Sequence, residues 1–559
     1  MTDPGGWGDE WDDVADVVVI GTGVAGMAAG LASASRGCSV IFVERAPFVG
    51  GTTAKSGGSM WIPNNRLMRD AGLVDERSQA LEYLAKVAYP AHYDASAPHL
   101  GLPELKYRLL EAFYDNGSVA FDELADLGAI PFDAQSVELG YPDYHADLPE
   151  DAAPLGRTIR VRLPDGHQRG LDPTGGEQLV EQMRKVAEGQ GSKFLLDTRV
   201  VHVVRNGEDE VVGVEARTGQ RTVLIGAQHG VVFATGGFLH DEGLRFDFVR
   251  GRLFGGAAGA GSTGDFVRIG AEVGAQLGNM TEAWWDEVAL ESVLRTPSTI
   301  EDVWSPFGDS MMIVNRYGRR VMNEKLPYSE RGPVHFNWDV DRSEHPNLLL
   351  FMVYDDAVAQ NAEPSATRHP VPMPGEPDDH VITADSWLEL AGAIEARLGE
   401  LAPHIGGFQV AETFLDGLLA AVERFDALAA AGTDLDHHRG ESLIERKWAS
   451  QPRPGSNNPF LHPFAAQGPF HCIVLAAGAL DTKGGPVIDG RAQVLSVDGS
   501  PIPGLFGAGN CIASPAGRGY WGPGGTIGPA LTFGYLAGVS AASGPMRLPT
   551  QEPEFQGSS

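Results

Sequence analysis

The chain has 559 residues, enough for about two domains with an inserted segment and for a core that buries a large cofactor. Its formal net charge of −32 disfavours nucleic acids and anionic membrane surfaces as partners, because like charges repel. Its three cysteines are too few and too scattered for a disulfide framework or a four-ligand zinc site.

The first thirteen residues are acidic and polar, and the apolar runs that follow are only of strand length. A secretion signal needs a basic start before an apolar core, and a membrane helix needs about 20 apolar residues. We therefore expect a cytoplasmic protein without an integral membrane segment, in which any membrane association is peripheral.

The first predicted element is a buried strand at 16–20 (DVVVI), followed by a glycine-rich turn and a helix that ends near Arg36. In the turn, Gly21 permits a tight bend and Gly23 lets the backbone approach a pyrophosphate, while Gly26 lets helix and strand pack closely. This order of strand, turn and helix predicts a dinucleotide site.

A second strand, 39–43, is expected to deliver Glu44 and Arg45 to the same site. The Glu44 carboxylate stands where it can accept hydrogen bonds from both ribose hydroxyls of an adenosine. The N–H groups of Val24 and Ala25, at the start of the first helix, are expected to attract the phosphates.

A second cluster of glycines and hydroxyls, 50–58 (GGTTAKSGG), follows the ribose-binding acid. An FAD pyrophosphate and flavin must pass this point, whereas nicotinamide enzymes do not need such a cluster, so the cofactor is predicted to be FAD. The predicted contacts here are Gly51, Thr52, Ser56, Gly57 and Gly58.

Five later segments complete the predicted FAD site. Residues 198–201 bring a backbone group to the adenine, 231–237 run from a buried strand into a glycine turn, and 261–265 repeat small residues with one acid. Residues 503–510 end a strand at the flavin, and 522–530 open a helix whose N-terminus is aimed at the flavin N1/O2 edge. The predicted contacts are Val201, Ala234, Thr235, Gly236, Gly264, Asp265, Gly509, Asn510, Gly525, Thr526 and Ile527.

Because the cofactor motifs lie at both ends of the chain, the FAD-binding domain is predicted to be discontinuous, with a first part at 14–280 and a second at 465–545. The motifs DVVVIGTGVAGMAAG, GGTTAKSGG, GSTGD, PIPGLFGAGN and GYWGPGGTIGPALTFGYLAG resemble those of the fumarate reductase and 3-ketosteroid dehydrogenase flavoproteins over nearly the whole chain. The last block is most similar to the 3-ketosteroid Δ1-dehydrogenases. The resemblance implies an α/β fold, with a Rossmann-like FAD-binding domain and an inserted α+β catalytic cap at 281–464.

Two positions separate the branches of this superfamily. Fumarate reductase-like members have a His before the Thr of a Thr-x-Gly-Gly motif and an arginine that donates the proton. Here Asp481 stands in place of the His, and an acid there would repel a dicarboxylate. Tyr328 stands where the ketosteroid enzymes have their catalytic base, so dicarboxylate reduction is disfavoured.

The resemblance also implies a mechanism that depends on tyrosines. Tyr520 and the backbone N–H of Gly524 would hold the oxygen of a ketone, which acidifies the neighbouring C–H bonds. Tyr328 would then take the proton from the α carbon while a hydride leaves the β carbon for flavin N5. Tyr144 would assist the base, although Tyr141, three residues earlier, could exchange roles with it.

The predicted function is therefore FAD-dependent introduction of a C=C bond next to the carbonyl of a cyclic ketone, with a 3-ketosteroid favoured. The alternatives are a smaller ring such as cyclohexanone, fumarate reductase-like enoate reduction, and a flavin carrier without catalysis. The electrons would pass to an external acceptor, a quinone, oxygen or another carrier. No metal site is expected, because the pair His437-His438 has no second ligand cluster at metal spacing.

Overall fold

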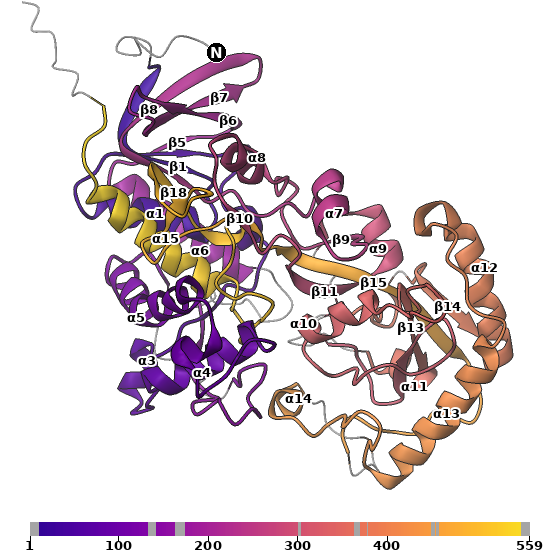
Figure 1. Cartoon of the computed structure of the whole chain (residues 1–559). Helices are drawn as coiled ribbons and strands as arrows, with labels where there is room; N and C mark the ends of the chain where they lie inside the picture. Colours follow the sequence, from indigo (N-terminus) through magenta and orange to yellow (C-terminus); the bar gives the residue numbers. More distant parts are fainter. Residues whose placement is uncertain are drawn as a thin grey trace, which may run out of the picture.

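The computed structural model describes residues 11–131, 141–161, 174–299, 303, 305–362, 369–376, 378–448, 453 and 458–548. These residues form a mixed α/β structure, as predicted, with one eight-stranded sheet, one six-stranded sheet and two two-stranded sheets. Figure 1 shows the two large sheets in separate parts of the ribbon, with strand β15 running from the neighbourhood of β10 into the second sheet.

The eight-stranded sheet has the main order β17-β18-β8-β1-β2-β5. Neighbours pair in parallel from β18 to β5, while β6 and β7 extend from β8 as an antiparallel excursion. Its strands are β1 (Asp13–Ile20), β2 (Val40–Val43), β5 (Lys193–Leu195), β6 (Thr198–Arg205), β7 (Val211–Thr218), β8 (Arg221–Phe233), β17 (Gln493–Leu495) and β18 (Pro501–Gly507).

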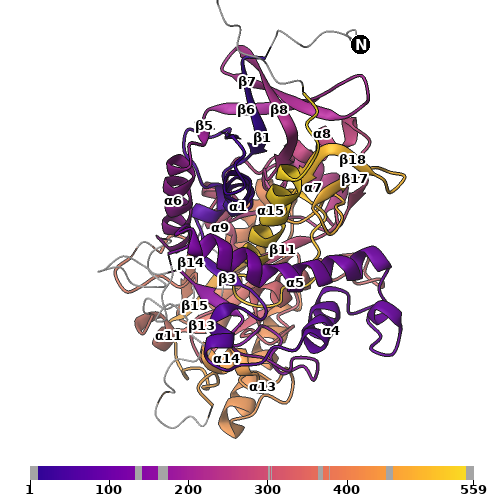
Figure 2. The same ribbon diagram turned by 90° about the vertical axis from the view of Figure 1, so that its left-hand side faces the viewer.

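Two helices from opposite ends of the chain, α1 (Val24–Ala34) and α15 (Ile527–Ala542), pack on each other and against this sheet. Helix α6 (Thr174–Gly189) packs on α1, and α8 (Asp265–Glu272) contacts β6. Gly534 and Gly538 let α15 approach α1 closely, since a Cβ on either glycine would lie 2.2 Å from the Ala25 oxygen or 2.1 Å from the Ala29 oxygen. Figure 2 shows α1 and α15 side by side.

The six-stranded sheet has the order β11-β15-β13-β12, and β14 and β9 also pair with β15. Its strands are β9 (Gly255–Gly256), β11 (Ala283–Ala289), β12 (Met311–Val314), β13 (Leu349–Asp355), β14 (Val381–Ala384) and β15 (Phe470–Thr482). The helices of this region are α7 (Glu242–Phe248), α9 (Leu290–Arg295), α10 (Tyr328–Arg331), α11 (Asp356–Gln360), α12 (Trp387–Ile405), α13 (Phe414–Ala431) and α14 (Leu443–Lys447), with the 3-10 turn η3 (Gly332–Phe336).

Helix α12 packs on this sheet because Leu390, Ile394 and Leu398 recur at four-residue spacing on one face, and all three are fully buried. The predicted domain boundaries at 280/281 and 464/465 stay predictions. Strand β15, which begins after the second boundary, pairs with β11, β13 and β14.

A third group of elements lies between residues 51 and 160 and contacts α15 through α5 and β3. It contains α2 (Gly51–Ala54), β3 (Ser59–Trp61), α3 (Arg66–Asp70), α4 (Arg77–Ala88), η2 (Pro98–Gly101), α5 (Glu104–Asp126) and β4 (Thr158–Arg160). The remaining short elements are β10 (Leu277–Gly278), β16 (Gly485–Pro486) and η4 (Gly509–Cys511). No helix in the described ranges is long and apolar enough to cross a bilayer.

Candidate active site

A cavity of about 780 Å³ opens where the parallel strands of the large sheet end. Strands β1, β2 and β8 lead into cavity-lining residues at their carboxyl ends, namely Gly21, Glu44 and Ala234, and Gly509 follows shortly after β18. Ligands of open α/β sheets bind at this edge. The chain therefore brings the separate predicted cofactor segments to one cavity.

The first glycine turn is packed too closely for side chains. Gly21 has φ +97°, and a Cβ there would lie 2.4 Å from the Ala234 oxygen. A Cβ on Gly26 would lie 2.0 Å from the Gly21 oxygen, so Gly26 allows α1 to start directly against the turn. This backbone cradle fits a dinucleotide, because only glycines leave the main chain accessible to a pyrophosphate.

The Glu44 carboxylate is held in the cavity wall by three hydrogen bonds. It accepts from the Thr22 N–H at 3.1 Å, from the Thr22 hydroxyl at 2.6 Å and from the Ala46 N–H at 2.9 Å. A carboxylate fixed in this way is oriented to accept from a ribose, as FAD requires.

Asp265, the acid of the motif GSTGD, contacts two arginines. The Asp265 carboxylate contacts the Arg199 guanidinium at 2.7 Å and the Arg45 guanidinium at 3.6 Å. Arg45 also donates to the Gly261 carbonyl at 3.0 Å and to the Thr263 hydroxyl at 2.6 Å. These contacts fix the loop before α8 beside the second strand of the sheet.

In the sequence, Asp481 served only as an argument against dicarboxylate reduction. In the structure, its carboxylate joins three of the cofactor loops. One carboxylate oxygen accepts from the Gly237 N–H at 2.8 Å, the Ser262 hydroxyl at 3.2 Å and the Asn510 amide at 3.3 Å. Burial raises the pKa of Asp481 to about 6, although these hydrogen bonds stabilise its charged form. The Asn510 side-chain oxygen accepts from the Trp284 indole at 2.8 Å.

Most of the predicted cofactor residues line the cavity. Gly21, Gly23, Val24, Ala25, Glu44, Arg45, Gly51, Thr52, Ser56, Gly57, Gly58, Ala234, Thr235, Gly236, Asp265, Gly509, Asn510, Thr526 and Ile527 do so. Gly26, Val201, Gly264 and Gly525 are not among the lining residues; Val200 lies there rather than Val201. A Cβ on Gly525 would lie 3.1 Å from the Tyr520 ring, so this glycine leaves room for that ring.

Some lining residues were missed by the sequence reasoning. Thr22 and Thr53 stand inside glycine motifs, where a hydroxyl beside the cofactor was a readable signal. Lys55, in the second motif, also lines the cavity, and its ammonium donates to the Ser298 hydroxyl at 2.9 Å. Further residues that were missed come from segments without a motif, among them Arg160, Ser298, Trp448 and Leu480.

The three tyrosines predicted to act in catalysis meet at the wall of the same cavity. The Tyr328 hydroxyl lies 3.0 Å from that of Tyr144 and 3.1 Å from that of Tyr520. The Tyr328 ring stands edge-on to both, with ring centres 5.7 Å and 5.6 Å apart. All three rings are buried.

Tyr141 lines the cavity but makes a different contact. Its hydroxyl accepts from the Trp448 indole at 2.6 Å. Tyr144, not Tyr141, is therefore the one of this pair within hydrogen-bonding distance of the Tyr328 hydroxyl. The assignment of Tyr144 as the assistant of the base stays a prediction, and this distance favours it.

Gly524 is one of the residues that line the cavity. It has φ +90°, and a Cβ there would lie 2.6 Å from the Ser59 oxygen. Its carbonyl accepts from the Trp61 N–H at 3.1 Å. Within the described part of the chain, no residue accepts a hydrogen bond from the Gly524 N–H, so this donor can serve a ligand.

Burial sets the protonation of this region. It raises the pKa of Tyr328, and the neighbouring Tyr144 and Tyr520 raise it further, so the resting phenol is neutral. Burial also lowers the pKa of Lys483 to about 7. The Lys483 ammonium donates to the Gly519 carbonyl at 2.9 Å and lies 4.1 Å from the centre of the Trp284 ring, which stands edge-on to Tyr520.

A buried ionic cluster includes the residue that precedes Tyr144. The Arg157 guanidinium contacts the carboxylates of Asp143 at 2.6 Å, Asp151 at 2.7 Å and Asp75 at 2.8 Å. Asp143 directly precedes Tyr144 and also accepts from the Trp61 indole at 2.7 Å. The backbone N–H of Trp61 donates to the Gly524 carbonyl. Through Trp61, the cluster therefore links the position of Tyr144 to that of the last glycine loop.

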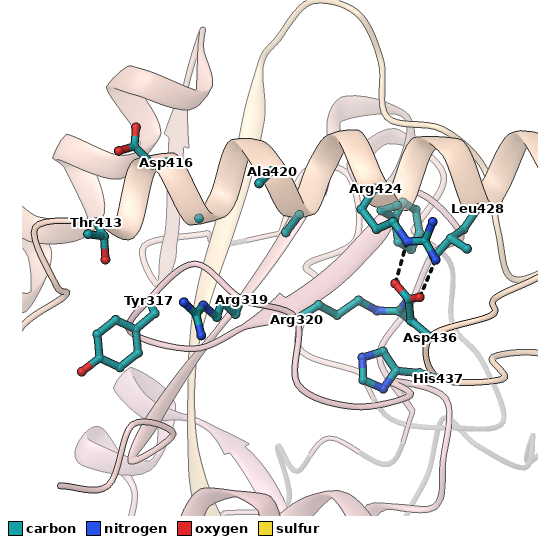
Figure 3. A pocket seen from close by; sticks show the side chains of 13 residues that line it. Tyr317, Arg319, Arg320, Thr413, Asp416, Ala420, Arg424, Leu428, Asp436 and His437 are labelled. Atoms are coloured by element: carbon teal, nitrogen blue, oxygen red, sulfur yellow. Dashed lines mark hydrogen bonds and ion pairs between the residues drawn. The ribbon is translucent and has the colours of Figure 1, made fainter. Parts of the chain in front are cut away.

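A second cavity, of about 520 Å³, lies between α13 and the turn at 317–320 (Figure 3). Two of the arginines that line it are paired within the protein. Arg424 binds Asp436 through two hydrogen bonds of 2.9 Å and 2.6 Å, and Arg320 binds Glu324 and Asp434. None of the predicted site residues lines this cavity.

Comparison with known proteins agrees with the geometry of the first cavity. A family model described as FAD binding domain matches residues 16–527. The 4-oxocyclohexanecarboxylate 2-dehydrogenase of Sinomonas cyclohexanicum is 31% identical, over 94% of this chain and 92% of that protein. A 3-oxosteroid 1-dehydrogenase of Mycobacterium tuberculosis is also 31% identical, over 94% of this chain and 98% of that protein.

Among solved structures, the 3-ketosteroid Δ1-dehydrogenase of Sterolibacterium denitrificans superposes with a TM-score of 0.78 at 23% identity, over 95% of this chain and 99% of that chain. This likeness concerns the fold. Together with the sequence matches, it leads to one assignment: the chain is an FAD-dependent oxidoreductase of the FAD-binding family that includes the 3-oxosteroid 1-dehydrogenases.

Proposed function

We propose that this enzyme introduces a C=C bond next to the carbonyl of a cyclic ketone. The observation that carries the proposal is the meeting of the Tyr144, Tyr328 and Tyr520 hydroxyls, 3.0 and 3.1 Å apart, in a cavity that Gly524 also lines. We further propose that a Rossmann-like FAD-binding domain is formed by 14–280 and 465–545 and a catalytic cap by 281–464.

In this proposal, Tyr520 and the Gly524 N–H donate to the ketone oxygen. Two fixed donors stabilise the negative charge that develops on this oxygen, and that makes the α hydrogen acidic. Tyr328, whose hydroxyl lies 3.1 Å from that of Tyr520, accepts the α proton. Because burial raises its pKa, Tyr328 is neutral at rest and acts as the base only after its own proton has passed to solvent. Tyr144, 3.0 Å away, donates to the phenolate oxygen so formed.

FAD, when bound, supplies the acceptor for the hydride that leaves the β carbon. Loss of one proton and one hydride converts the ketone into an α,β-unsaturated ketone. The chain's part in cofactor binding is assigned to the backbone around Gly21 and Gly23, with Glu44 toward the ribose. Asp481 holds the loops of Gly237, Ser262 and Asn510 against the same cavity.

The relatives support two substrate classes. Those named 3-oxosteroid 1-dehydrogenase favour a 3-ketosteroid, and the Sinomonas relative is named for 4-oxocyclohexanecarboxylate, a smaller ring ketone. Enoate reduction is a weaker candidate, because the relatives at 31% identity are named as dehydrogenases of ring ketones, whereas the relative named probable fumarate reductase is 23% identical. The reoxidising partner is proposed to be an external acceptor such as a quinone or oxygen.

Anaerobic titration of the purified yellow protein tests the proposal. Androst-4-ene-3,17-dione or a substituted cyclohexanone is expected to bleach the oxidised flavin and yield the unsaturated ketone, identified by mass spectrometry. Fumarate added to the dithionite-reduced enzyme is expected to leave the flavin reduced. A flavin that no ketone bleaches would contradict the proposal and leave an electron carrier, and reoxidation by fumarate would indicate an enoate reductase.

A further inference from the structure

We propose that Lys483 is a positioning residue for the reaction, and that its ammonium charge keeps the ketone-binding phenol of Tyr520 in place from behind the cavity wall. This inference rests on the proposed function and adds a residue that does not itself line the cavity. It follows from what the Lys483 ammonium contacts and from how those contacts lead to Tyr520.

The Lys483 side chain reaches the loop of Tyr520 by a direct hydrogen bond. Its ammonium donates to the Gly519 carbonyl at 2.9 Å, and Gly519 directly precedes Tyr520. The Lys483 backbone is fixed as well, because its N–H donates to the Glu282 carbonyl at 3.1 Å and its carbonyl accepts from the Ser514 N–H at 3.1 Å. The short connection between β15 and β16 therefore determines where the loop of Tyr520 lies.

The same ammonium acts on Tyr520 from a second direction, through Trp284. It lies 4.1 Å from the centre of the Trp284 ring, a distance at which a cation is attracted to an aromatic face. The Trp284 ring stands edge-on to the Tyr520 ring, with centres 5.1 Å apart and an angle of 73° between the planes. The Trp284 indole also donates to the Asn510 side chain at 2.8 Å, which fixes the rotation of the ring. One ammonium therefore holds both the backbone before Tyr520 and the ring packed beside its phenol.

The charge of Lys483 depends on pH in the neutral range. Lys483 is 1% exposed, and no carboxylate in the described part of the chain forms an ion pair with its ammonium. The charged groups around it pair with each other instead, Arg250 with Glu282 and Arg518 with Glu330. Burial lowers the pKa of Lys483 to about 7, while the two acids raise it and the two arginines lower it. The attraction to the aromatic ring is therefore present below pH 7 and is lost as the pH rises.

The test compares the wild type with Lys483→Met, which keeps the length of the side chain but removes its charge. Flavin bleaching by androst-4-ene-3,17-dione is followed anaerobically in the stopped flow with both FAD-loaded proteins. The ratio of the two rates cancels the ionisation of Tyr328, which both proteins share. We expect a ratio of about tenfold at about pH 6, because small displacements of catalytic groups are costly, and of about twofold or less at about pH 9. A purely structural role gives a ratio that does not change with pH.

Two variants shift the titration while Lys483 stays in place, and they keep the test decisive if Lys483→Met fails to fold. Arg518→Gln removes a cation that lowers the pKa of Lys483, so the midpoint of the pH–rate profile is expected to rise by about half a unit. Glu282→Gln removes an acid that raises this pKa, so the midpoint is expected to fall. Lys185→Met, at a side chain that is 62% exposed, is the control and should follow the wild-type profile. FAD content and far-UV circular dichroism report whether each variant is folded.

The outcomes distinguish this inference from the proposed function. If the wild-type flavin bleaches but the ratio to Lys483→Met is the same at every pH, the role of the Lys483 charge is wrong and ketone desaturation stands. If the midpoints of Arg518→Gln and Glu282→Gln coincide with that of the wild type or move in the same direction, the role is likewise wrong. If neither androst-4-ene-3,17-dione nor a substituted cyclohexanone bleaches the wild-type flavin, the proposed function fails and this inference fails with it.

Discussion

The cofactor cradle and the tyrosine cluster occupy one cavity but are built in different ways. Each loop of the cradle directly follows the strand that positions it, as Gly21 follows β1 and Ala234 follows β8. The tyrosine cluster instead joins Tyr144 to Tyr328 across 184 positions and Tyr328 to Tyr520 across 192. A local motif therefore identifies the cofactor, whereas the chemistry depends on contacts that only the complete fold creates.

The two regions also differ in what holds them. The cradle depends on close backbone approaches that exclude side chains, and the tyrosine cluster depends on hydroxyl contacts supported by buried charges. Damage to the first should release FAD, and damage to the second should stop catalysis while FAD stays bound. The predictions below test this separation.

Tyr328→Phe should have the largest effect. Removal of the hydroxyl deletes the proposed base, so the rate of flavin bleaching by a ketone is expected to fall by about a thousandfold, within the range of general base catalysis. FAD content and the flavin absorbance should be retained. Tyr141→Phe is the matched control, since its hydroxyl contacts Trp448 instead. A wild-type rate in Tyr328→Phe, or an equal loss in Tyr141→Phe, would remove Tyr328 from the role of base.

Gly26→Ala should break the cradle instead. The new methyl group would lie 2.0 Å from the Gly21 oxygen, so α1 must move away from the glycine turn. We expect FAD affinity to fall by about a hundredfold, measured by fluorescence titration of the apoprotein, while far-UV circular dichroism reports the fold. Gly189→Ala has open space around its Cβ and should bind FAD normally. Full FAD occupancy in Gly26→Ala would contradict the assignment of this turn.

Asp481→Asn should change how stability depends on pH. The native pKa of Asp481 is raised from 3.8 to about 6, so its contribution is fully present below pH 4 and is lost as the pH rises through 6. The shift corresponds to about 3 kcal/mol of unfolding free energy. Urea unfolding between pH 4 and pH 7 should therefore show a smaller decline in the variant than in the wild type.

The control for this measurement is the exposed Asp498, whose pKa is lowered to about 2 and so lies outside the window. Asp498→Asn should follow the wild-type decline. Parallel curves for the wild type and Asp481→Asn would show that the Asp481 carboxyl does not titrate in this range.

The sequence predicted the cofactor cradle better than the contacts that depend on the complete fold. The glycine turn and Glu44 were readable because strand, turn and acid are adjacent in the chain. Val201 was placed one residue away from the lining residue Val200, because the side that faces the cavity is set by the pairing of β6 with β7. Arg160 carried no motif and reaches the cavity only because β4 pairs with β3, about a hundred residues earlier.

The tyrosines were assigned through resemblance and not through spacing, since nothing in the local sequence brings three distant phenols together. The contacts of Asp481 with three loops could not be predicted either, because the three donors come from loops far apart in the chain. Sequence reasoning therefore found the residue but not its contacts.

Trp61→Phe should have the smallest effect and tests the link between the two regions. Phenylalanine keeps most of the packing volume but removes the indole N–H that donates to Asp143 at 2.7 Å, so a buried carboxylate oxygen loses a partner. We expect stability to fall by about 1 to 3 kcal/mol. We also expect ketone-dependent bleaching to slow by about tenfold, because small displacements of catalytic groups are costly.

The comparison that decides the point is with Trp338→Phe, a change at an indole that is 53% exposed, which should leave rate and stability unaltered. A drop in stability without a change in rate would show that the Arg157 cluster supports only the fold. A slower rate with full FAD occupancy would instead mean that the backbone of Trp61, which binds the Gly524 carbonyl, has shifted with its side chain. In that case the buried charges set the geometry of the ketone-binding amide.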